Sequence, residues 1–337
     1  MELADFKKIL QGEALFRSKQ AQKAVFKDLI KNWSQAMVLP LALRQKLNQE
    51  LSLEIKAEVF TSNDNKTIKA LIDLKDGLKT ETVLMRYSDR NTACLSSMVG
   101  CSLACEFCAT GKMGFKRNLT IGEIIEQVLF FNRYLKEENQ KVNSIVFMGM
   151  GEPFLNYDNV LGAIRILNDK DYFNIGARRI SISTVGIVEG IKKLTEEKLQ
   201  VNLAISLHAP NDALRSKMMP VNKKYPLVKI LRAVEDYLKA TRRKIMFEYI
   251  MIKDVNDSLE NAKELATMLS GLKPFIFMVN LISYNPTGVF KTSLPERIKD
   301  FKVVLQESKI ETTQRYKFGQ GIKAACGQLT QSTADKN

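Results

Sequence analysis

The sequence has little of several features that mark other classes of protein. It contains one histidine and one tryptophan among 337 residues, and its apolar runs, such as residues 144–150, fall far short of a bilayer-spanning length of about 20 residues. Glu2 and Asp5 lie where a signal peptide is positively charged. We therefore expect a cytoplasmic protein with no membrane contact. At 45% hydrophobic and 26% charged residues, the composition also excludes a disordered chain.

Acidic residues are fewer than basic residues. The chain has 37 Asp and Glu against 51 Lys and Arg, a formal net charge of +14. This excess favours a polyanionic partner, because Lys and Arg displace the counterions of phosphate groups. Anionic lipid is the alternative, but no basic amphipathic helix with a Trp, Phe and Leu face stands out, so we expect a nucleic acid. Residues 1–50, with nine basic and five acidic side chains, form either part of the binding surface or an ordinary solvated helical face.

The spacing of apolar residues predicts three regions and a tail. Residues 1–50 have helical spacing, residues 51–90 alternate as strands do, strands alternate with helices over 91–327, and 328–337 remain as a frayed tail. Strands are expected at 54–59, 67–74, 81–87, 92–99, 144–148, 179–183, 200–206, 244–250, 275–282 and 311–316. Helices are expected at 14–33, 41–51, 120–136, 157–167, 186–196, 227–240, 259–270 and 294–308. Such alternation predicts parallel βαβ units, and six of them suit an open or partial barrel better than a closed barrel of eight.

The strongest chemical signal comes from the five cysteines, Cys94, Cys101, Cys105, Cys108 and Cys326. An odd number, with four of them inside fifteen positions, is no framework of disulfides. The middle three form a CxxxCxxC motif just after the first predicted barrel strand. Three thiolates on one loop can bind three irons of a four-iron cluster and leave the fourth iron open. Zinc is the alternative, but a second pair of ligands is missing and a Cys₃His site would need the single histidine, His208.

Further sequence blocks accompany this motif. They are CLSSMVGC (94–101), MGMGEP (148–153), RRISIST (178–184), LAISLHAPND (203–212), SYNP (283–286) and AACGQL (324–329). CxxxCxxC on the first loop of a βα barrel is the signature of radical S-adenosylmethionine (SAM) enzymes. With these blocks in the same order over nearly its whole length, the chain closely resembles the RlmN family of dual-specificity RNA adenosine methyltransferases, which is related to the Cfr resistance methyltransferases. It departs from the family at Met98, where Gln is usual, and at Gly321, where Asp is usual.

The resemblance implies a fold and an activity. The fold would be α/β, a partial (β/α)6 TIM-like radical-SAM barrel (91–327) with a helical N-terminal RNA-binding domain (1–50) and a short β extension (51–90). The activity would be methylation of adenosine carbon 2 in 23S rRNA, at the peptidyl transferase centre, and in tRNA next to the anticodon. Methylation of carbon 8, as in Cfr, is the nearest alternative, but GEP (151–153) and HAPND (208–212) resemble the carbon-2 enzymes.

Two further alternatives belong to other classes. In a non-catalytic, metal-stabilised RNA-binding protein, Cys94, Cys326 and Glu81 would be superfluous. A radical SAM enzyme that acts on a small molecule would have no use for the charge of +14.

The resemblance also assigns roles to individual residues. One 4Fe-4S cluster with an open iron would be bound by Cys101, Cys105 and Cys108. Cys326 would carry the methyl group, Cys94 would form a transient disulfide with it, and Glu81 would be the general base. SAM, used twice per turnover, would be bound by Phe107, Gly151, Glu152, Ser183, Ser206, Leu207, His208 and Asn285. The partners would be 23S rRNA and tRNA, contacted also by the basic stretches 112–117, 223–224 and 242–244, and an electron donor such as flavodoxin with its reductase. The protein would act as a monomer.

Overall fold

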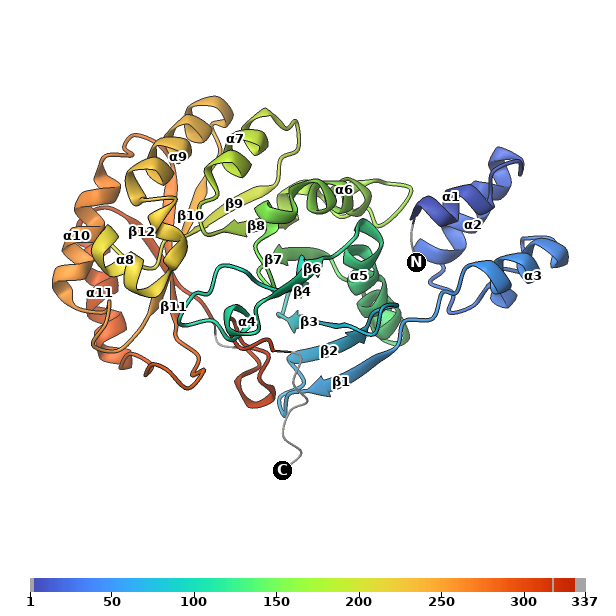
Figure 1. The fold of residues 1–337 in the computed structure, drawn as a ribbon, viewed down its shortest axis with the longest axis horizontal. Helices are drawn as coiled ribbons and strands as arrows, with labels where there is room; N and C mark the ends of the chain where they lie inside the picture. Colours follow the sequence, from blue (N-terminus) through green and yellow to red (C-terminus); the bar gives the residue numbers. More distant parts are fainter. Residues whose placement is uncertain (1–2, 317, 331–337) are drawn as a thin grey trace.

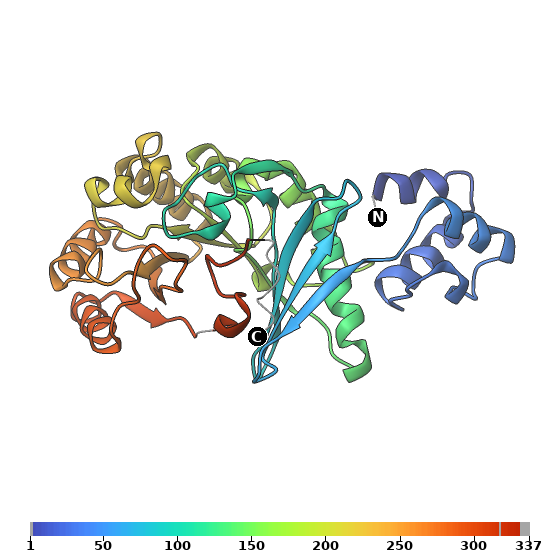
Figure 2. The same cartoon turned by 60° about the horizontal axis from the view of Figure 1, so that its bottom comes forward.

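The computed structural model describes residues 3–316 and 318–330 and shows three regions side by side (Figure 1). Short N-terminal helices lie at one end. An antiparallel section of sheet follows, and a curved section covered by helices forms the other end (Figure 2). This order in space follows the order in the sequence.

The N-terminal helices are α1 (Leu3–Ile9), α2 (Leu15–Phe26) and α3 (Leu41–Glu50), with the 3-10 turn η1 (Trp33–Gln35) between the last two. They pack around Trp33, whose buried indole N–H donates to a backbone carbonyl just after α3 at 2.7 Å. The helix predicted over 14–33 ends early, because Leu29 has a left-handed backbone (φ 57°) and the Ile30 N–H turns back to a carbonyl in the last turn of α2.

The strands of the described residues form one ten-stranded open sheet and one two-stranded hairpin. The antiparallel section consists of β1 (Ala57–Thr61), β2 (Thr67–Asp73) and β3 (Lys79–Arg86), and it pairs with the first barrel strand, β4 (Asn91–Cys94). The parallel section continues through β7 (Ser144–Phe147), β8 (Ile180–Thr184), β9 (Asn202–Ser206), β10 (Ile245–Met251), β11 (Phe277–Ser283) and β12 (Glu311–Gln314). The sheet is not closed, so the predicted partial barrel is confirmed, and the β extension is a continuation of its sheet.

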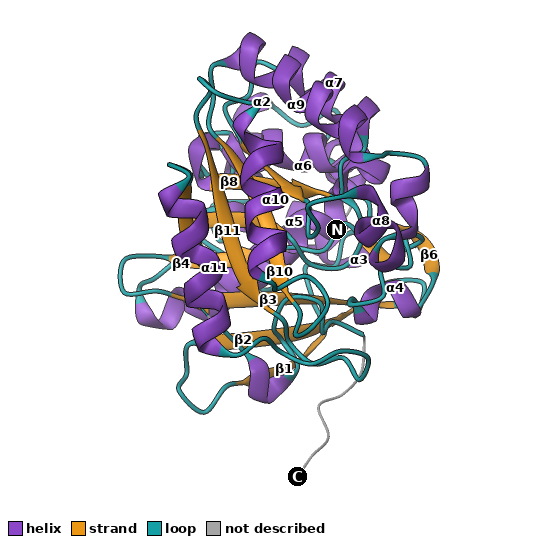
Figure 3. Cartoon of the chain, turned by 90° about the vertical axis from the view of Figure 1, so that its left-hand side faces the viewer, coloured by secondary structure: helices purple, strands orange, loops and turns teal. Residues whose placement is uncertain are grey.

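The helices predicted in this region lie on the outside of the curved sheet, within two residues of their predicted bounds (Figure 3). They are α5 (Ile121–Leu135), α6 (Tyr157–Asn168), α7 (Val188–Glu196), α9 (Leu227–Thr241), α10 (Leu259–Ser270) and α11 (Pro295–Glu307). Helix α5 shows why such bounds can be predicted. Thr120 and Glu123 form a reciprocal capping box, which satisfies N–H groups at the start of the helix.

The strand predicted over 92–99 is broken in two. Strand β4 ends at Cys94, and β5 (Met98–Gly100) pairs instead with β6 (Phe115–Asn118) in a hairpin. At the break the Ser96 N–H donates to the Gln127 side chain at 2.9 Å, and the Ser96 hydroxyl donates to the Glu81 carbonyl at 2.5 Å. Side-chain partners here replace the regular strand ladder.

The short helices α4 (Ala109–Lys112) and α8 (Asp212–Met218) were not predicted. The predicted tail is not frayed at its start, because Leu329 is buried; the remainder, 331–337, lies outside the described residues. Among the residues that the structure describes, no helix is both long and apolar enough to cross a bilayer.

Candidate active site

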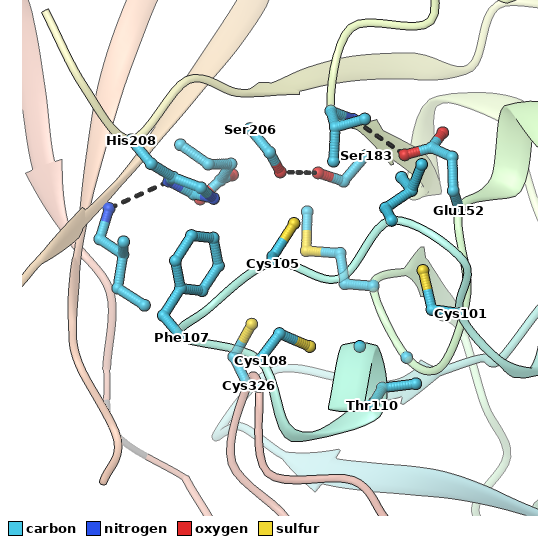
Figure 4. A pocket seen from close by; sticks show the side chains of 18 of the residues that line it. Cys101, Cys105, Phe107, Cys108, Thr110, Glu152, Ser183, Ser206, His208 and Cys326 are labelled. Atoms are coloured by element: carbon cyan, nitrogen blue, oxygen red, sulfur yellow. Dashed lines mark hydrogen bonds between the residues drawn. The ribbon is translucent and has the colours of Figure 1, made fainter. Parts of the chain in front are cut away.

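A cavity opens at the carboxyl ends of the parallel strands, where barrel enzymes place their sites. It encloses about 960 Å³ of empty space, its open mouth included. Its walls bring together predicted residues from distant parts of the chain, namely Cys101, Cys105, Phe107, Cys108, Gly151, Glu152, Ser183, Ser206, His208 and Cys326 (Figure 4). Most of the predicted site is therefore one continuous surface.

The loop that carries the CxxxCxxC motif is tightly held. The Cys101 N–H donates to Gly114 of the β5–β6 hairpin at 3.0 Å, and the Cys108 N–H donates to the Cys105 carbonyl at 3.0 Å. Ala104 has a left-handed backbone (φ 49°), which is uncommon for a residue with a side chain and turns the loop back on itself.

Burial disfavours the thiolate form of the loop cysteines Cys101 and Cys105. Burial raises the pKa of Cys101 to about 11 and that of Cys105 well above its usual value, and the neighbouring thiols add to both shifts. A cation coordinated there would favour the thiolate form. In the described residues, no three His, Cys, Asp or Glu side chains are grouped closely enough to hold a single metal ion. A four-iron cluster needs no such group, because each thiolate binds a different iron.

Gly151 and Glu152 lie opposite the loop, just after β7. Gly151 has φ 97°, and a Cβ at this position would lie 2.6 Å from the Met98 Cβ, so only glycine fits. The Glu152 carboxylate accepts the Phe154 N–H at 3.0 Å and the Val185 N–H at 2.9 Å. Burial raises the pKa of Glu152 to about 7, and these hydrogen bonds partly oppose the shift.

The ends of β8 and β9 carry the next group of side chains. The Ser183 and Ser206 hydroxyls lie 3.2 Å apart and face the cavity (Figure 4). His208 has a left-handed backbone (φ 61°), and its Nδ1 accepts the Ile250 N–H at 3.1 Å. Its ring meets the edge of Phe107 at a centroid distance of 5.0 Å. Burial lowers the pKa of His208 to about 3, so this imidazole stays neutral.

The C-terminal segment, residues 324–330, brings Cys326 to the loop that carries the CxxxCxxC motif, residues 101–108 (the cluster loop). The Gly327 carbonyl accepts the Ala109 N–H at 2.8 Å, and the Leu329 carbonyl accepts the Thr110 hydroxyl at 2.7 Å. Both donors belong to α4, directly after Cys108. Hydrogen bonds from the helix that directly follows the loop therefore hold the segment in place, and Cys326 lies beside Cys108 (Figure 4).

A second, smaller cavity adjoins the first. Cys94, Asn285, Arg315 and Cys326 line it, and Arg315 and Cys326 line both cavities. Burial raises the pKa of Cys94 to about 12, Cys326 adds to the shift, and Arg315 opposes it. All five cysteines lie in the described residues and all are free thiols, so the structure does not support a standing disulfide.

Similarity to known proteins identifies the family. The model of the Radical SAM superfamily matches residues 95–266. A probable dual-specificity RNA methyltransferase RlmN from Dictyoglomus thermophilum is 45% identical over 320 residues, which cover 94% of this chain and 91% of that protein. One from Protochlamydia amoebophila, named RlmN 2, is 44% identical and covers 98% of this chain and 94% of its own. The crystal structure of a radical SAM methyltransferase from Sphaerobacter thermophilus matches with a TM-score of 0.93 and 41% identity, over 98% of each chain.

The chain belongs to the RlmN family of radical SAM RNA methyltransferases. This membership confirms the resemblance seen in the motifs. It also confirms that the protein is an enzyme of the radical SAM class. Membership in this family implies a 4Fe-4S cluster and SAM as cofactors and RNA as the substrate class.

Besides Cys94, three of the residues predicted from the RlmN resemblance do not line the main cavity. Leu207 is fully buried, and its carbonyl accepts the Arg215 Nε–H at 3.0 Å. The Asn285 amide donates to the Cys326 carbonyl at 3.1 Å, so it holds the C-terminal segment in this structure. Glu81 is buried beneath that segment. One of its carboxylate oxygens lies 2.9 Å from Lys69 Nζ, and the other accepts the Thr330 N–H at 2.9 Å.

The sequence prediction missed two charged residues of this RlmN site, Glu248 and Arg315, both of which line the main cavity. Each carried a signal. Glu248 is an acid inside an otherwise apolar strand, where an acid is rarely buried without a purpose. Arg315 directly follows a barrel strand at its carboxyl end, where functional side chains gather.

Two of the basic side chains in the stretches expected to face RNA form ion pairs in this structure. Arg117 forms ion pairs with Asp76 at 2.6 Å and with Glu123 at 2.7 Å, which tie the hairpin to the β extension and to α5. Lys244 pairs with Glu311 at 2.7 Å.

Proposed function

We propose that the protein methylates carbon 2 of adenosine in 23S rRNA and in tRNA next to the anticodon, with Cys326 as the carrier of the methyl group. One observation supports the carrier role above all. Cys326 comes from the far end of the chain, yet it lines the same cavity as Cys101, Cys105 and Cys108 (Figure 4). A cysteine with a purely structural role would have no need of this position.

The cavity provides for both cofactors. Cys101, Cys105 and Cys108 would hold one 4Fe-4S cluster with an open iron, and a neighbouring SAM would be oriented through its amino group by the Glu152 carboxylate. Bound there, the cluster would supply the electron that cleaves SAM and so give the site hydrogen-abstracting radical chemistry. Two SAM molecules per turnover, one as methyl source and one as radical source, and a donor such as flavodoxin with its reductase complete the proposal.

We assign separate tasks to Cys326, Cys94 and Glu81. Cys326 holds the methyl carbon on its sulfur and presents it to the base. Cys94, across the second cavity, later attacks that sulfur and releases the base through a transient disulfide. Glu81 takes the proton from carbon 2. Because the Thr330 N–H occupies the Glu81 carboxylate, we infer that this end of the segment moves aside when RNA is bound.

The choice of carbon 2 over carbon 8 depends on the GEP and HAPND blocks, and the choice of RNA depends on the charge of +14. The target base must leave its stack to reach Cys326, as in other enzymes that modify bases. A single chain supplies every residue named here, which supports action as a monomer. Mass spectrometry of 23S rRNA and tRNA from a deletion strain should show loss of 2-methyladenosine; loss of 8-methyladenosine alone would contradict the assignment.

Two variants test the separate tasks of the cysteines. Cys326→Ala should form no bond to RNA, because the methyl carrier is missing. Cys94→Ala should still carry a methyl group on Cys326 and add to the base, then stall. It should leave cells covalently attached to RNA, visible as a nuclease-sensitive shift on a denaturing gel. Normal turnover by Cys94→Ala, or an adduct on Cys326→Ala, would show that the tasks are wrongly assigned.

A further inference from the structure

Arg315 lies on the wall shared by the two cavities. It directly follows β12, and its backbone N–H donates to the Leu281 carbonyl at 2.9 Å, which extends the pairing of β12 with β11 by one residue. Its side chain lines the cavity of the cluster cysteines and also the cavity of Cys94. Cys94 and Cys326, whose sulfurs must meet in the release step proposed above, line the second cavity together with this positive charge.

Side chains from two other parts of the sheet approach the guanidinium, Met148 just after β7 and Glu248 on β10. Arg315 Nη1 lies 3.2 Å from the Met148 sulfur and 3.9 Å from a carboxylate oxygen of Glu248. That same oxygen accepts the Asn280 amide at 2.8 Å, and the Asn280 oxygen accepts the Thr313 hydroxyl at 3.1 Å. The distance to Glu248 is long for an ion pair, so much of the positive charge remains available to other groups near the cavity wall.

A nearby positive charge would favour the reactive thiolate form of Cys94. Its reaction requires the thiolate, and burial opposes ionisation by raising the pKa of Cys94 to about 12. Of the charged and titratable groups around it, Cys326 on the C-terminal segment raises this pKa further and Arg315 lowers it. Glu248 on β10 and Tyr87 after β3 act on the charge of Arg315. The Met148 backbone N–H also favours the thiolate, but it carries no net charge.

We propose that Arg315 is a positioning residue for the release step, whose guanidinium holds the Cys94 thiolate opposite the Cys326 sulfur. In this step the Cys94 sulfur attacks the Cys326 sulfur and an S–S bond forms. The S–C bond to the methylene on the base breaks, and its electron pair stays on the carbon, which takes up a proton to become the methyl group. Two equivalents of an external thiol then reduce this disulfide and are themselves oxidised to a disulfide. The inference rests on the proposed function of Cys94 and Cys326.

Substitutions at Arg315 test whether its charge or its packing matters for the release step. In the cluster-loaded enzyme with its RNA substrate, Arg315→Met and Arg315→Gln both lack the charge, whereas Arg315→Lys retains it. We expect the first two to methylate Cys326 and form the RNA adduct but to resolve it about tenfold more slowly or worse at neutral pH, since one pKa unit is tenfold in thiolate. Raising the pH from about 7 to about 9 should restore their resolution rate. Arg315→Lys should resolve the adduct at nearly the normal rate.

Cys94→Ala provides the matched control, because its adduct should resolve at no pH. The result that would overturn the proposal is normal resolution by Arg315→Gln at neutral pH, or a variant that keeps its cluster absorption but forms no adduct. Using two uncharged variants keeps the test decisive if one of them loses the cluster. If Cys94→Ala itself forms no adduct, the proposed function fails, and this outcome is distinct from failure of Arg315 alone.

Discussion

At the scale of single residues, the proposed contact between Glu152 and SAM would couple cofactor binding to pH. Burial raises its pKa to about 7, so near pH 6 the carboxyl is mostly protonated before SAM binds. The positive amino group of SAM would favour the carboxylate and expel that proton. We therefore expect proton release on SAM binding near pH 6, and an affinity that falls as the pH drops below about 7, by up to tenfold per unit.

Calorimetry of SAM binding in buffers with different enthalpies of ionisation measures the number of protons released. Glu152→Gln is the matched control, since it keeps the shape of the side chain and should bind SAM more weakly with no proton release. His208 does not interfere, because its pKa of about 3 leaves it neutral throughout this range. Unchanged proton release in Glu152→Gln would assign the titration to another group.

The residues that sequence reasoning found and missed differ in the kind of signal they carry. The shared position of Cys101, Cys105 and Cys108 on one cavity wall could be predicted because their motif fixes their spacing on one loop. Arg315 and Glu248 belong to the site through the curvature of the sheet, which brings β10 and β12 to the same cavity. No sequence spacing predicts that these two residues line the same cavity.

At the scale of elements, α4 links the cluster loop to the C-terminal segment. The Thr110 hydroxyl donates to the Leu329 carbonyl at 2.7 Å, and both residues are buried. Thr110→Val keeps the volume but leaves that carbonyl without its partner, a loss of about 1 kcal/mol. We expect severalfold slower methylation of Cys326, measured by mass spectrometry, with unchanged iron content. Thr110→Ser retains the hydroxyl and should behave normally; equal loss in both variants would show that packing, not the hydrogen bond, matters.

Elements with a strong local signal agreed with prediction, and those made by distant contacts did not. Helix α5 carries its capping box in its own sequence, so its start at Ile121 was predictable to one residue. The break after Cys94 depends on Gln127, a residue of that later helix, whose side chain accepts the Ser96 N–H. Local propensity does not contain such a tertiary partner, and the pattern over 92–99 therefore resembled one strand.

At the scale of the whole molecule, the N-terminal helices are fixed to the barrel rather than loosely attached. The Arg133 guanidinium on α5 donates to the carbonyl of Leu53, at 2.7 Å, and to that of Ile30. The Phe26 ring packs edge-on against Tyr172 and Phe173, with centroids 5.0 and 5.3 Å away. Deleting residues 1–50 would therefore expose the barrel core, so substitutions on the surface give a cleaner test of RNA binding.

Lys19, Lys27 and Lys46 are exposed on this fixed N-terminal region. If they contact phosphate groups, each should release counterions, so that the affinity for RNA falls as salt rises, with a slope reduced by about 0.7 to 0.9 for every contact removed. Changing all three to Gln should weaken RNA binding at low salt, flatten the salt dependence and leave RNA-independent methylation of Cys326 intact. Lys192→Gln, an exposed charge on the outer barrel helix α7, is the matched control and should change neither quantity. An unaltered salt slope in the triple variant would place the phosphate contacts elsewhere, because counterion release depends on the contacts themselves and not on the net charge of the chain.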